Sequence, residues 1–163
     1  MRFTIKLERA NHQMKLWIDA DACPRVIKDI LIRMAERTHT SLTFVSNSWL
    51  KLPDLAFISL IQVSQGLDVA DDEIVKLCEA GDLIITADIP LAAKVVAKGA
   101  LALDYRGKFY DAENIRHILS IRNFMSEMRE SGVETGGPSN FSKKDQQLFA
   151  NELDKFITRH RQA

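Results

Sequence analysis

Short apolar runs alternate with longer amphipathic segments along most of the chain. The apolar runs have the length of buried strands and are residues 16–20, 42–46, 58–63, 83–86 and 100–103. The amphipathic segments carry apolar residues at helical spacing and are residues 24–38, 69–80, 90–98, 111–130 and 142 onward. This alternation is typical of β-α units. We therefore predict an α/β fold of three layers, α/β/α, around a mostly parallel central sheet.

Residues at the ends of the amphipathic segments support the predicted helices. Pro24 fits the first position of a helix, where its missing N–H is not needed. Gly81 follows the second helix and tolerates a left-handed end. Asp111 is suited to cap the fourth helix, and Ser142 and Asp145 have the spacing of a capping box.

The two C-terminal helices each carry an apolar stripe, which we expect to face the body of the protein. In the first helix the stripe is Ile115, Ile118, Leu119, Phe124 and Met128. In the second helix it is Leu148, Phe149, Leu153, Phe156 and Ile157. Both stripes predict helices that pack on the sheet or on other helices.

The chain has 163 residues, about the size of one domain. We expect a single domain over residues 14–163. We expect residues 1–13 to be an N-terminal extension outside the fold, because no pattern links them to the first strand. No apolar run approaches the roughly 18 residues of a membrane span, so we expect no membrane partner.

Charge and cysteine content narrow the function classes. The 22 basic and 22 acidic residues balance, so no overall field attracts nucleic acid or anionic lipid. Binding to a polyanion therefore needs a local patch. Cys23 and Cys78 form no Cys-x-x-Cys pair and support neither a zinc motif nor a disulfide framework. We expect a cytoplasmic protein.

Aspartates follow the ends of several predicted strands. Asp19 and Asp21 follow the first strand on one side of it. Asp68 and Asp72 follow the third strand, one helical turn apart, and Asp88 follows the fourth. Ligands of open α/β sheets bind at the carboxyl ends of the strands, so we expect these side chains to meet.

Three further acids lie near these positions. Asp71 shares the first helical turn with Asp72, and Asp104 ends the fifth strand. Asp82 precedes the fourth strand and should lie at the opposite edge of the sheet, away from the other acids. We count Asp71 with the metal-binding set and leave Asp82 and Asp104 out of it.

Several carboxylates at one edge repel one another unless a cation lies among them. Oxygen ligands without His or Cys favour Mg²⁺ or Mn²⁺, ions that activate water for attack on phosphoryl groups. We therefore expect a Mg²⁺ or Mn²⁺ site. Its expected ligands are Asp19, Asp21, Asp68, Asp71, Asp72 and Asp88, and the expected catalytic residues are Asp19, Asp68, Asp72 and Asp88.

These acids also have an ordinary structural interpretation. Asp68 can be a helix cap, and Asp71 and Asp72 in a first turn can stabilise the helix dipole by about 0.3–1 kcal/mol each.

Four segments resemble the YaiI/YqxD family of uncharacterised bacterial proteins. They are residues 17–24 (WIDADACP), 66–71 (GLDVAD), 85–92 (ITADIPLA) and 135–138 (TGGP). The similarity runs from about Lys15 to the last helix. More distantly, the Gly-Leu-Asp and Thr-Ala-Asp segments are similar to the acidic motifs of PIN-like and NYN ribonuclease domains.

The more distant resemblance implies a PIN-like fold and cleavage of phosphodiesters, with RNA as the expected partner. The metal-binding acids of those domains correspond in this resemblance to Asp19, Asp68, Asp71 or Asp72, and Asp88. The chain departs from the NYN pattern at Gln65, where a Lys is usual, and at Pro90, where a further acid is usual.

Polar residues near the strand ends are candidates for holding a substrate. They are Ser46, Asn47, Thr86, Arg106, Lys108, Gly136 and Gly137. The segment 105–110 (YRGKFY) interleaves aromatic rings with cations, as sites for single-stranded nucleic acid do, although an ordinary turn fits equally well. Residues 135–139 could present backbone N–H groups to a phosphate, or could be a hinge. Cys23 is interpreted as a small packing residue.

Three function classes remain open. The leading hypothesis is a metal-dependent nuclease acting on RNA. The first alternative is a haloacid-dehalogenase-like phosphatase with Asp19 as nucleophile and Asp21 as acid, although Cys23 replaces the usual Thr or Val. The second is a non-catalytic PIN-like module that binds RNA or a protein.

Overall fold

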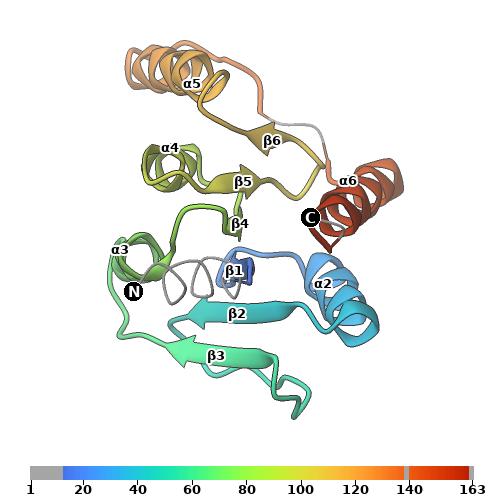
Figure 1. The fold of residues 1–163 in the computed structure, drawn as a ribbon. Helices are drawn as coiled ribbons and strands as arrows, with labels where there is room; N and C mark the ends of the chain where they lie inside the picture. Colours follow the sequence, from blue (N-terminus) through green and yellow to red (C-terminus); the bar gives the residue numbers. More distant parts are fainter. Residues whose placement is uncertain (1–12, 138–139, 162–163) are drawn as a thin grey trace, which may run out of the picture.

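A computed structural model describes residues 13–137 and 140–161 (Figure 1). The strands are β1 (Lys15–Asp19), β2 (Ser41–Ser46), β3 (Ile58–Gln62), β4 (Leu83–Ile85), β5 (Leu101–Leu103) and β6 (Phe109–Tyr110). The helices are α2 (Arg25–Thr38), α3 (Val69–Leu77), α4 (Ile89–Ala97), α5 (Ile115–Glu130) and α6 (Lys143–Arg161). The predicted three-layer α/β fold is confirmed. The prediction for residues 1–13 falls, apart from Gln13, outside the described residues.

The six strands form one sheet in the order β3-β2-β1-β4-β5-β6. The pairs from β3 to β5 are all parallel, and β6 is antiparallel to β5. β1 lies between β2 and β4, with Ile18 beside Phe44 on one side and Ile85 on the other. The carboxyl ends of β1 to β5 therefore share one edge of the sheet.

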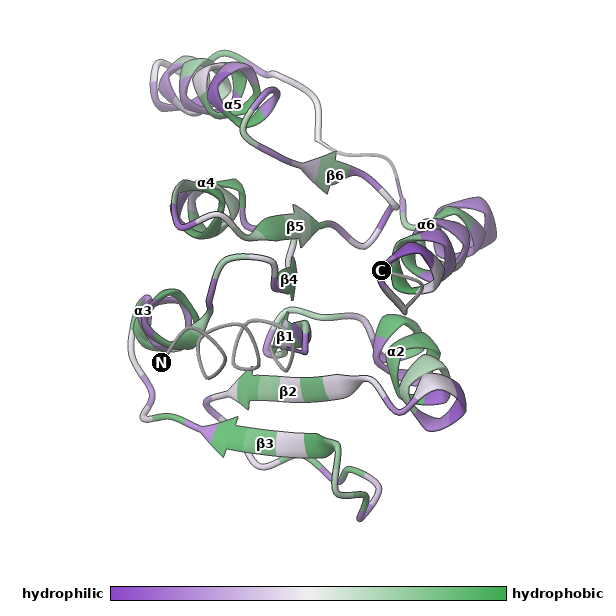
Figure 2. Cartoon of the chain, viewed as in Figure 1, coloured by the Kyte–Doolittle hydropathy of each residue, from purple (hydrophilic) through white to green (hydrophobic). Residues whose placement is uncertain are grey.

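Helices cover both faces of the sheet, with α2 and α6 on one face and α3, α4 and α5 on the other (Figure 1). On the first face Leu31, Phe44 and Phe149 are fully buried, and on the second Ile84 and Val95 are. β4 and β5 consist of apolar residues alone, and β1 is apolar between its two end residues, because both faces of the sheet are covered (Figure 2). None of the described helices has the length and hydropathy that a membrane span requires.

Asp82 lies at the amino edge of the sheet, as predicted. Its buried carboxylate accepts hydrogen bonds from the Trp17 indole N–H at 3.0 Å and from the backbone N–H groups of Lys15 and Glu79 at 3.1 and 2.9 Å. This residue joins the start of β1 to the start of β4. It has a structural role at the edge opposite the other strand-end acids.

Some sequence-based predictions for the C-terminal half were wrong. Strand β6 was not predicted, because two residues are too few to show a strand period. Phe124 and Leu148 are 57% and 42% exposed instead of facing the body. The reason for Phe124 is that α5 lies at the edge of the molecule, where it packs on α4, and Ile115 is the buried residue of this helix.

The start of α5 also differs from the prediction. Asn114 occupies the N-cap position, and the Asp111 carboxylate instead accepts the N–H groups of Glu113 and Asn114 in the preceding turn. The predicted capping box of α6 is confirmed: Ser142 Oγ accepts the Asp145 N–H, and the Asp145 carboxylate accepts the Ser142 N–H.

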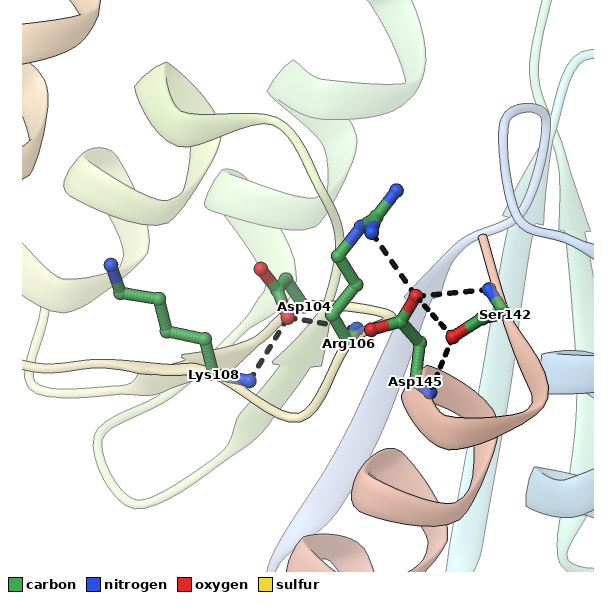
Figure 3. A network of polar contacts seen from close by, with 5 residues as sticks. All are labelled: Asp104, Arg106, Lys108, Ser142 and Asp145. Carbon is green, nitrogen blue, oxygen red and sulfur yellow. Dashed lines mark hydrogen bonds and ion pairs between the residues drawn. The ribbon is translucent and has the colours of Figure 1, made fainter. Parts of the chain in front are cut away.

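A polar network joins the β5–β6 hairpin to the start of α6 (Figure 3). The Asp104 carboxylate accepts the N–H groups of Arg106 and Lys108 and the Tyr110 hydroxyl, which fixes the turn. The Arg106 guanidinium forms an ion pair with Asp145 at 3.1 Å. Asp104 therefore has a structural role.

Gly107 brings this turn into close contact with α6. Its φ is +88°, and a Cβ there would lie 2.9 Å from the Leu148 carbonyl carbon. Gly81 has a φ of +90°, but a Cβ there would meet no described atom within 4 Å. The two glycines thus share a backbone conformation and differ in their surroundings.

We expect Gly107→Ala to lower the melting temperature more than Gly81→Ala does. Both changes impose an unfavourable backbone conformation that costs about 1–3 kcal/mol. Only Gly107→Ala also displaces α6, and each kcal/mol corresponds to about 2–4 °C. Thermal unfolding followed by circular dichroism measures the difference. Equal losses in the two variants would contradict the proposed contact with α6.

Candidate functional site

A hollow of about 220 Å³ lies at the edge of the sheet where β1 to β4 end. It is lined by Asp19, Asp21, Ala22, Asn47, Ser64, Gly66, Asp68, Ala70, Asp71 and Asp88. We call it the acidic pocket, because no Lys, Arg or His is among the described residues that line it. Five of the six predicted ligands therefore lie together at the carboxyl ends of the strands, and Asp72 is the exception.

Asp19 is the last residue of β1 and is 9% exposed. The Thr86 hydroxyl donates a hydrogen bond of 2.9 Å to its carboxylate, and the Tyr105 hydroxyl donates one of 3.3 Å to its backbone carbonyl. Burial raises the pKa of Asp19, and repulsion from Asp88 and Asp21 adds to this rise. Asp19 is therefore a charged group held in a place that disfavours its charge.

Thr86 connects Asp19 to Asp88. Its hydroxyl donates to Asp19 and accepts the backbone N–H of Asp88 at 3.0 Å. Asp88 is also the N-cap of α4, because its Oδ1 accepts the Leu91 N–H at 3.0 Å. Thr86 itself is fully buried. Its position indicates that it orients the two acids, whereas the sequence predicted that it binds a substrate.

Asp71 faces the pocket from the first turn of α3. Burial raises its pKa to about 7, the charges of Asp19 and Asp88 contribute, and a hydrogen bond with Asp88 favours the protonated form. Two carboxyl groups in such contact share a proton more readily than they carry two charges.

Asp72 is exposed and is not among the pocket-lining residues, although the sequence predicted it as catalytic. The prediction assumed that Asp68 and Asp72 are one helical turn apart. That spacing is present, because the Asp72 N–H donates to the Asp68 carbonyl at 2.9 Å. Asp68 has a left-handed conformation, however, with a φ of +63°, and of the two residues only Asp68 lines the pocket, so the two carboxylates do not share one face. The structure places Asp71 at the position expected for Asp72.

Asp68 occupies the N-cap position of α3 without a side-chain capping bond. The alternative of a purely structural helix cap is therefore wrong for its carboxylate. The left-handed conformation is unfavourable for a residue with a Cβ, although Asp tolerates it better than most. It directs the exposed Asp68 into the lining of the acidic pocket.

Asp21 holds the loop that follows β2. Its carboxylate accepts the Ser46 hydroxyl at 2.7 Å and the Asn47 backbone N–H at 3.1 Å. Ser46 is 1% exposed, so it positions Asp21 and does not line the pocket, whereas Asn47 does. Ser64, which the sequence analysis missed, also lines it and follows β3 as the other strand-end residues follow their strands.

The donor set of the acidic pocket has the chemistry of a site for a hard divalent cation, because carboxylates are the ligands that Mg²⁺ and Mn²⁺ prefer. Within the described part of the chain, however, no three acidic, His or Cys side chains already stand as ligands around one point. Asp19, Asp21 and Asp88 each accept a hydrogen bond from another residue. A cation would have to draw them together.

The remaining predicted substrate-binding residues lie outside the acidic pocket. Arg106 is paired with Asp145 and contacts the Phe141 ring, 5.9 Å from its centroid. Lys108 lines a hollow beside α5, and Gly136 and Gly137 line another beside the end of α5. None of them is among the described residues that line the acidic pocket, and their roles remain predictions.

Two interpretations based on single residues are settled by burial. Tyr105 and Tyr110 are 7% and 4% exposed, so their rings are not available for stacking on bases. Burial raises the pKa of the Cys23 thiol to about 12, which makes it a poor nucleophile and agrees with a packing role.

Comparison with known proteins identifies the family of the chain. The model described as an uncharacterized BCR, YaiI/YqxD family, matches residues 17–159. UPF0178 proteins from Shewanella halifaxensis and Pectobacterium carotovorum are 56% and 57% identical to the chain. They cover 90% and 88% of it and 97% and 96% of their own lengths. No solved structure matches the chain. The match spans residues 17–24, 66–71, 85–92 and 135–138, and the chain therefore belongs to the YaiI/YqxD family of uncharacterised bacterial proteins.

Proposed function

We propose that the acidic pocket binds Mg²⁺ or Mn²⁺ and hydrolyses phosphodiester bonds, with RNA as the substrate. The observation that carries this proposal is that Asp19, Asp68, Asp71 and Asp88 line one hollow without a cationic side chain from the described residues. Unbalanced negative charge of this kind favours a bound cation, and carboxylates select a hard one.

The residues of the pocket have distinct roles in this proposal. Asp19, Asp68, Asp71 and Asp88 hold the cation, which supplies Lewis-acid chemistry that stabilises charge on a phosphoryl group and activates water. Thr86 orients Asp19 and the loop that carries Asp88. Asp21 keeps Asn47 at the rim, where its amide can contact a substrate.

The hydrogen bonds of Asp21 favour a nuclease over the phosphatase alternative. A phosphatase of the haloacid-dehalogenase kind needs Asp21 as a general acid beside the nucleophile Asp19. Here the Asp21 carboxylate is occupied by the Ser46 hydroxyl and the Asn47 N–H. The resemblance to PIN-like and NYN ribonuclease domains points in the same direction. The non-catalytic alternative is an outcome of the experiments below.

Calorimetry should detect binding of Mn²⁺ to the wild type and at least tenfold weaker binding to Asp88→Asn. Asn at an N-cap still accepts the Leu91 N–H, so the variant loses charge and keeps the helix cap. Asp72→Asn is the matched control, because it removes one charge from an exposed residue of the same region. Equal affinity in wild type and Asp88→Asn would contradict the proposed cation site.

Cleavage of single-stranded RNA in Mn²⁺ should fall by more than about a hundredfold in Asp19→Asn and in Asp88→Asn. Changes to residues that only support metal ligands already cost 10–100-fold, so loss of a ligand should cost more. Asp72→Asn should retain most of the activity. Wild-type rates in both site variants would refute the mechanism. Mn²⁺ binding without any cleavage of RNA would favour the alternative of a non-catalytic module.

Stability in the presence of a chelator should fall as the pH rises from about 4 to about 7. The pKa of Asp71 rises on folding from its ordinary value of 3.8 to about 7, so the folded state holds a proton that the unfolded state releases in this window.

Asp71→Asn removes this titration and should melt higher than the wild type at pH 8. The advantage should shrink towards pH 4 and on addition of Mn²⁺, which offsets the repulsion in the wild type. Asp72→Asn provides the control for general loss of charge. Thermal unfolding at several pH values makes the comparison, and an Asp71→Asn melting temperature no higher than that of wild type at pH 8 would be inconsistent with crowded acids.

A further inference from the structure

A second hollow, of about 250 Å³, lies between α4, α5 and the β5–β6 hairpin. Its apolar lining comes from Ile89 at the start of α4 and from Ile118, Ile121 and Met125 on one side of α5. Its polar lining consists of Lys108, Arg122 and Arg129, and none of the described residues that line it is acidic. We call it the cationic groove.

The three cations of the groove have no carboxylate partner within the described part of the chain. Arg122 and Arg129 donate to the neutral oxygens of Asn123 and Thr135 at 3.3 and 3.4 Å, both at the surface. The Lys108 side chain extends away from the ion pair of Arg106 and Asp145 (Figure 3). Three cations that face one hollow without compensation favour an anionic ligand.

Consecutive residues at the start of α4 line the acidic pocket and the cationic groove. Asp88 lines the pocket and Ile89 lines the groove, and consecutive Cα atoms are about 3.8 Å apart. Arg129 lines the groove and also the hollow of the glycine-rich segment 132–137. A chain with phosphates at regular intervals could therefore contact Arg129, Arg122 and Lys108 while one phosphate reaches the acids.

The chemistry of the groove selects among possible occupants. A second copy of this chain placed symmetrically on the groove would bring cations against cations. A duplex keeps its bases stacked inside and leaves an apolar lining unused. A single strand offers phosphates to the cations and base faces to Ile118, Ile121 and Met125.

We propose that the cationic groove binds the backbone of a single-stranded polynucleotide and leads it to the acidic pocket. The role of the groove as a substrate path rests on the proposed function, whereas its binding of a strand can be measured without cleavage. Lys108, Arg122 and Arg129 contact phosphates, and the apolar lining contacts bases without selecting a sequence.

Fluorescence anisotropy of labelled single-stranded RNA and DNA oligonucleotides, in EDTA and at several salt concentrations, tests this proposal. The groove variant carries Lys108→Gln, Arg122→Gln and Arg129→Gln. Each lost phosphate contact should reduce the slope of log affinity against log salt by about 0.7, hence by about 2 for the triple variant. Affinity at low salt should fall at least tenfold.

The matched control removes three exposed cations from α2 and α6. It carries Arg33→Gln, Lys143→Gln and Arg159→Gln, so it has the same net charge as the groove variant and should keep the wild-type slope. A variant with Arg122→Lys and Arg129→Lys retains the positive charges of the groove and should also keep the wild-type slope. Circular dichroism checks that all variants fold.

Equal binding of RNA and DNA indicates recognition of the backbone, whereas preference for RNA indicates recognition of the 2′-hydroxyl. Both outcomes support binding of a single strand in the groove.

Two results would overturn the proposal: no binding of either oligonucleotide to the wild type, or equal losses in the groove and control variants. Because EDTA prevents cleavage, these results say nothing against a cation site that calorimetry detects. Conversely, loss of binding confined to the groove variant supports the groove even if the protein cleaves no RNA. The two proposals therefore fail independently.

Discussion

The parallel pairing of β1 with β4 at the centre of the sheet is the constraint on which the candidate site depends. Ile18 lies beside Ile85 in this pairing, so Asp19 and Thr86 leave the sheet side by side. The single hydroxyl of Thr86 then holds the Asp19 carboxylate and the backbone of Asp88. At the opposite edge Asp82 joins the starts of the same two strands, through Lys15 and the indole of Trp17. The central pair is thus fixed at both ends.

The close placement of these acids lowers the stability of the folded protein. Burial and mutual repulsion raise the pKa values of Asp19 and Asp71, and each rise measures a preference for the uncharged form. Two apolar cores, one on each face of the sheet, allow the fold to accommodate such a site. Local destabilisation of this kind is common where a protein binds a ligand, because ligand binding returns the lost free energy.

A formal net charge of zero conceals a strong separation of charge around the start of α4. Asp88 lines the acidic pocket together with four other carboxylates, whereas the next residue, Ile89, lines the groove together with Lys108, Arg122 and Arg129. Overall charge therefore says little about polyanion binding in this protein. Since surface charges act over about 10 Å at moderate ionic strength, the local arrangement decides what the surface attracts.

The sequence by itself determined the layers of the fold and most of the pocket. The alternation of apolar and amphipathic segments predicts the order of strands and helices. Because ligands of open α/β sheets bind at the carboxyl ends of the strands, the positions of Asp19, Asp68 and Asp88 then predict that these residues lie together. Both inferences depend on local patterns, which a sequence records directly.

Only the tertiary structure decided which neighbouring residue faces the pocket and how the surface is shaped. The orientation of α3 against the sheet directs Asp71 into the pocket and leaves Asp72 exposed, although both lie in the first turn of the helix. The cationic groove combines α4, α5 and a hairpin whose strand β6 is too short to be recognised. Such features depend on how each helix is oriented against the sheet and on contacts between distant segments, and periodicity carries no information about either.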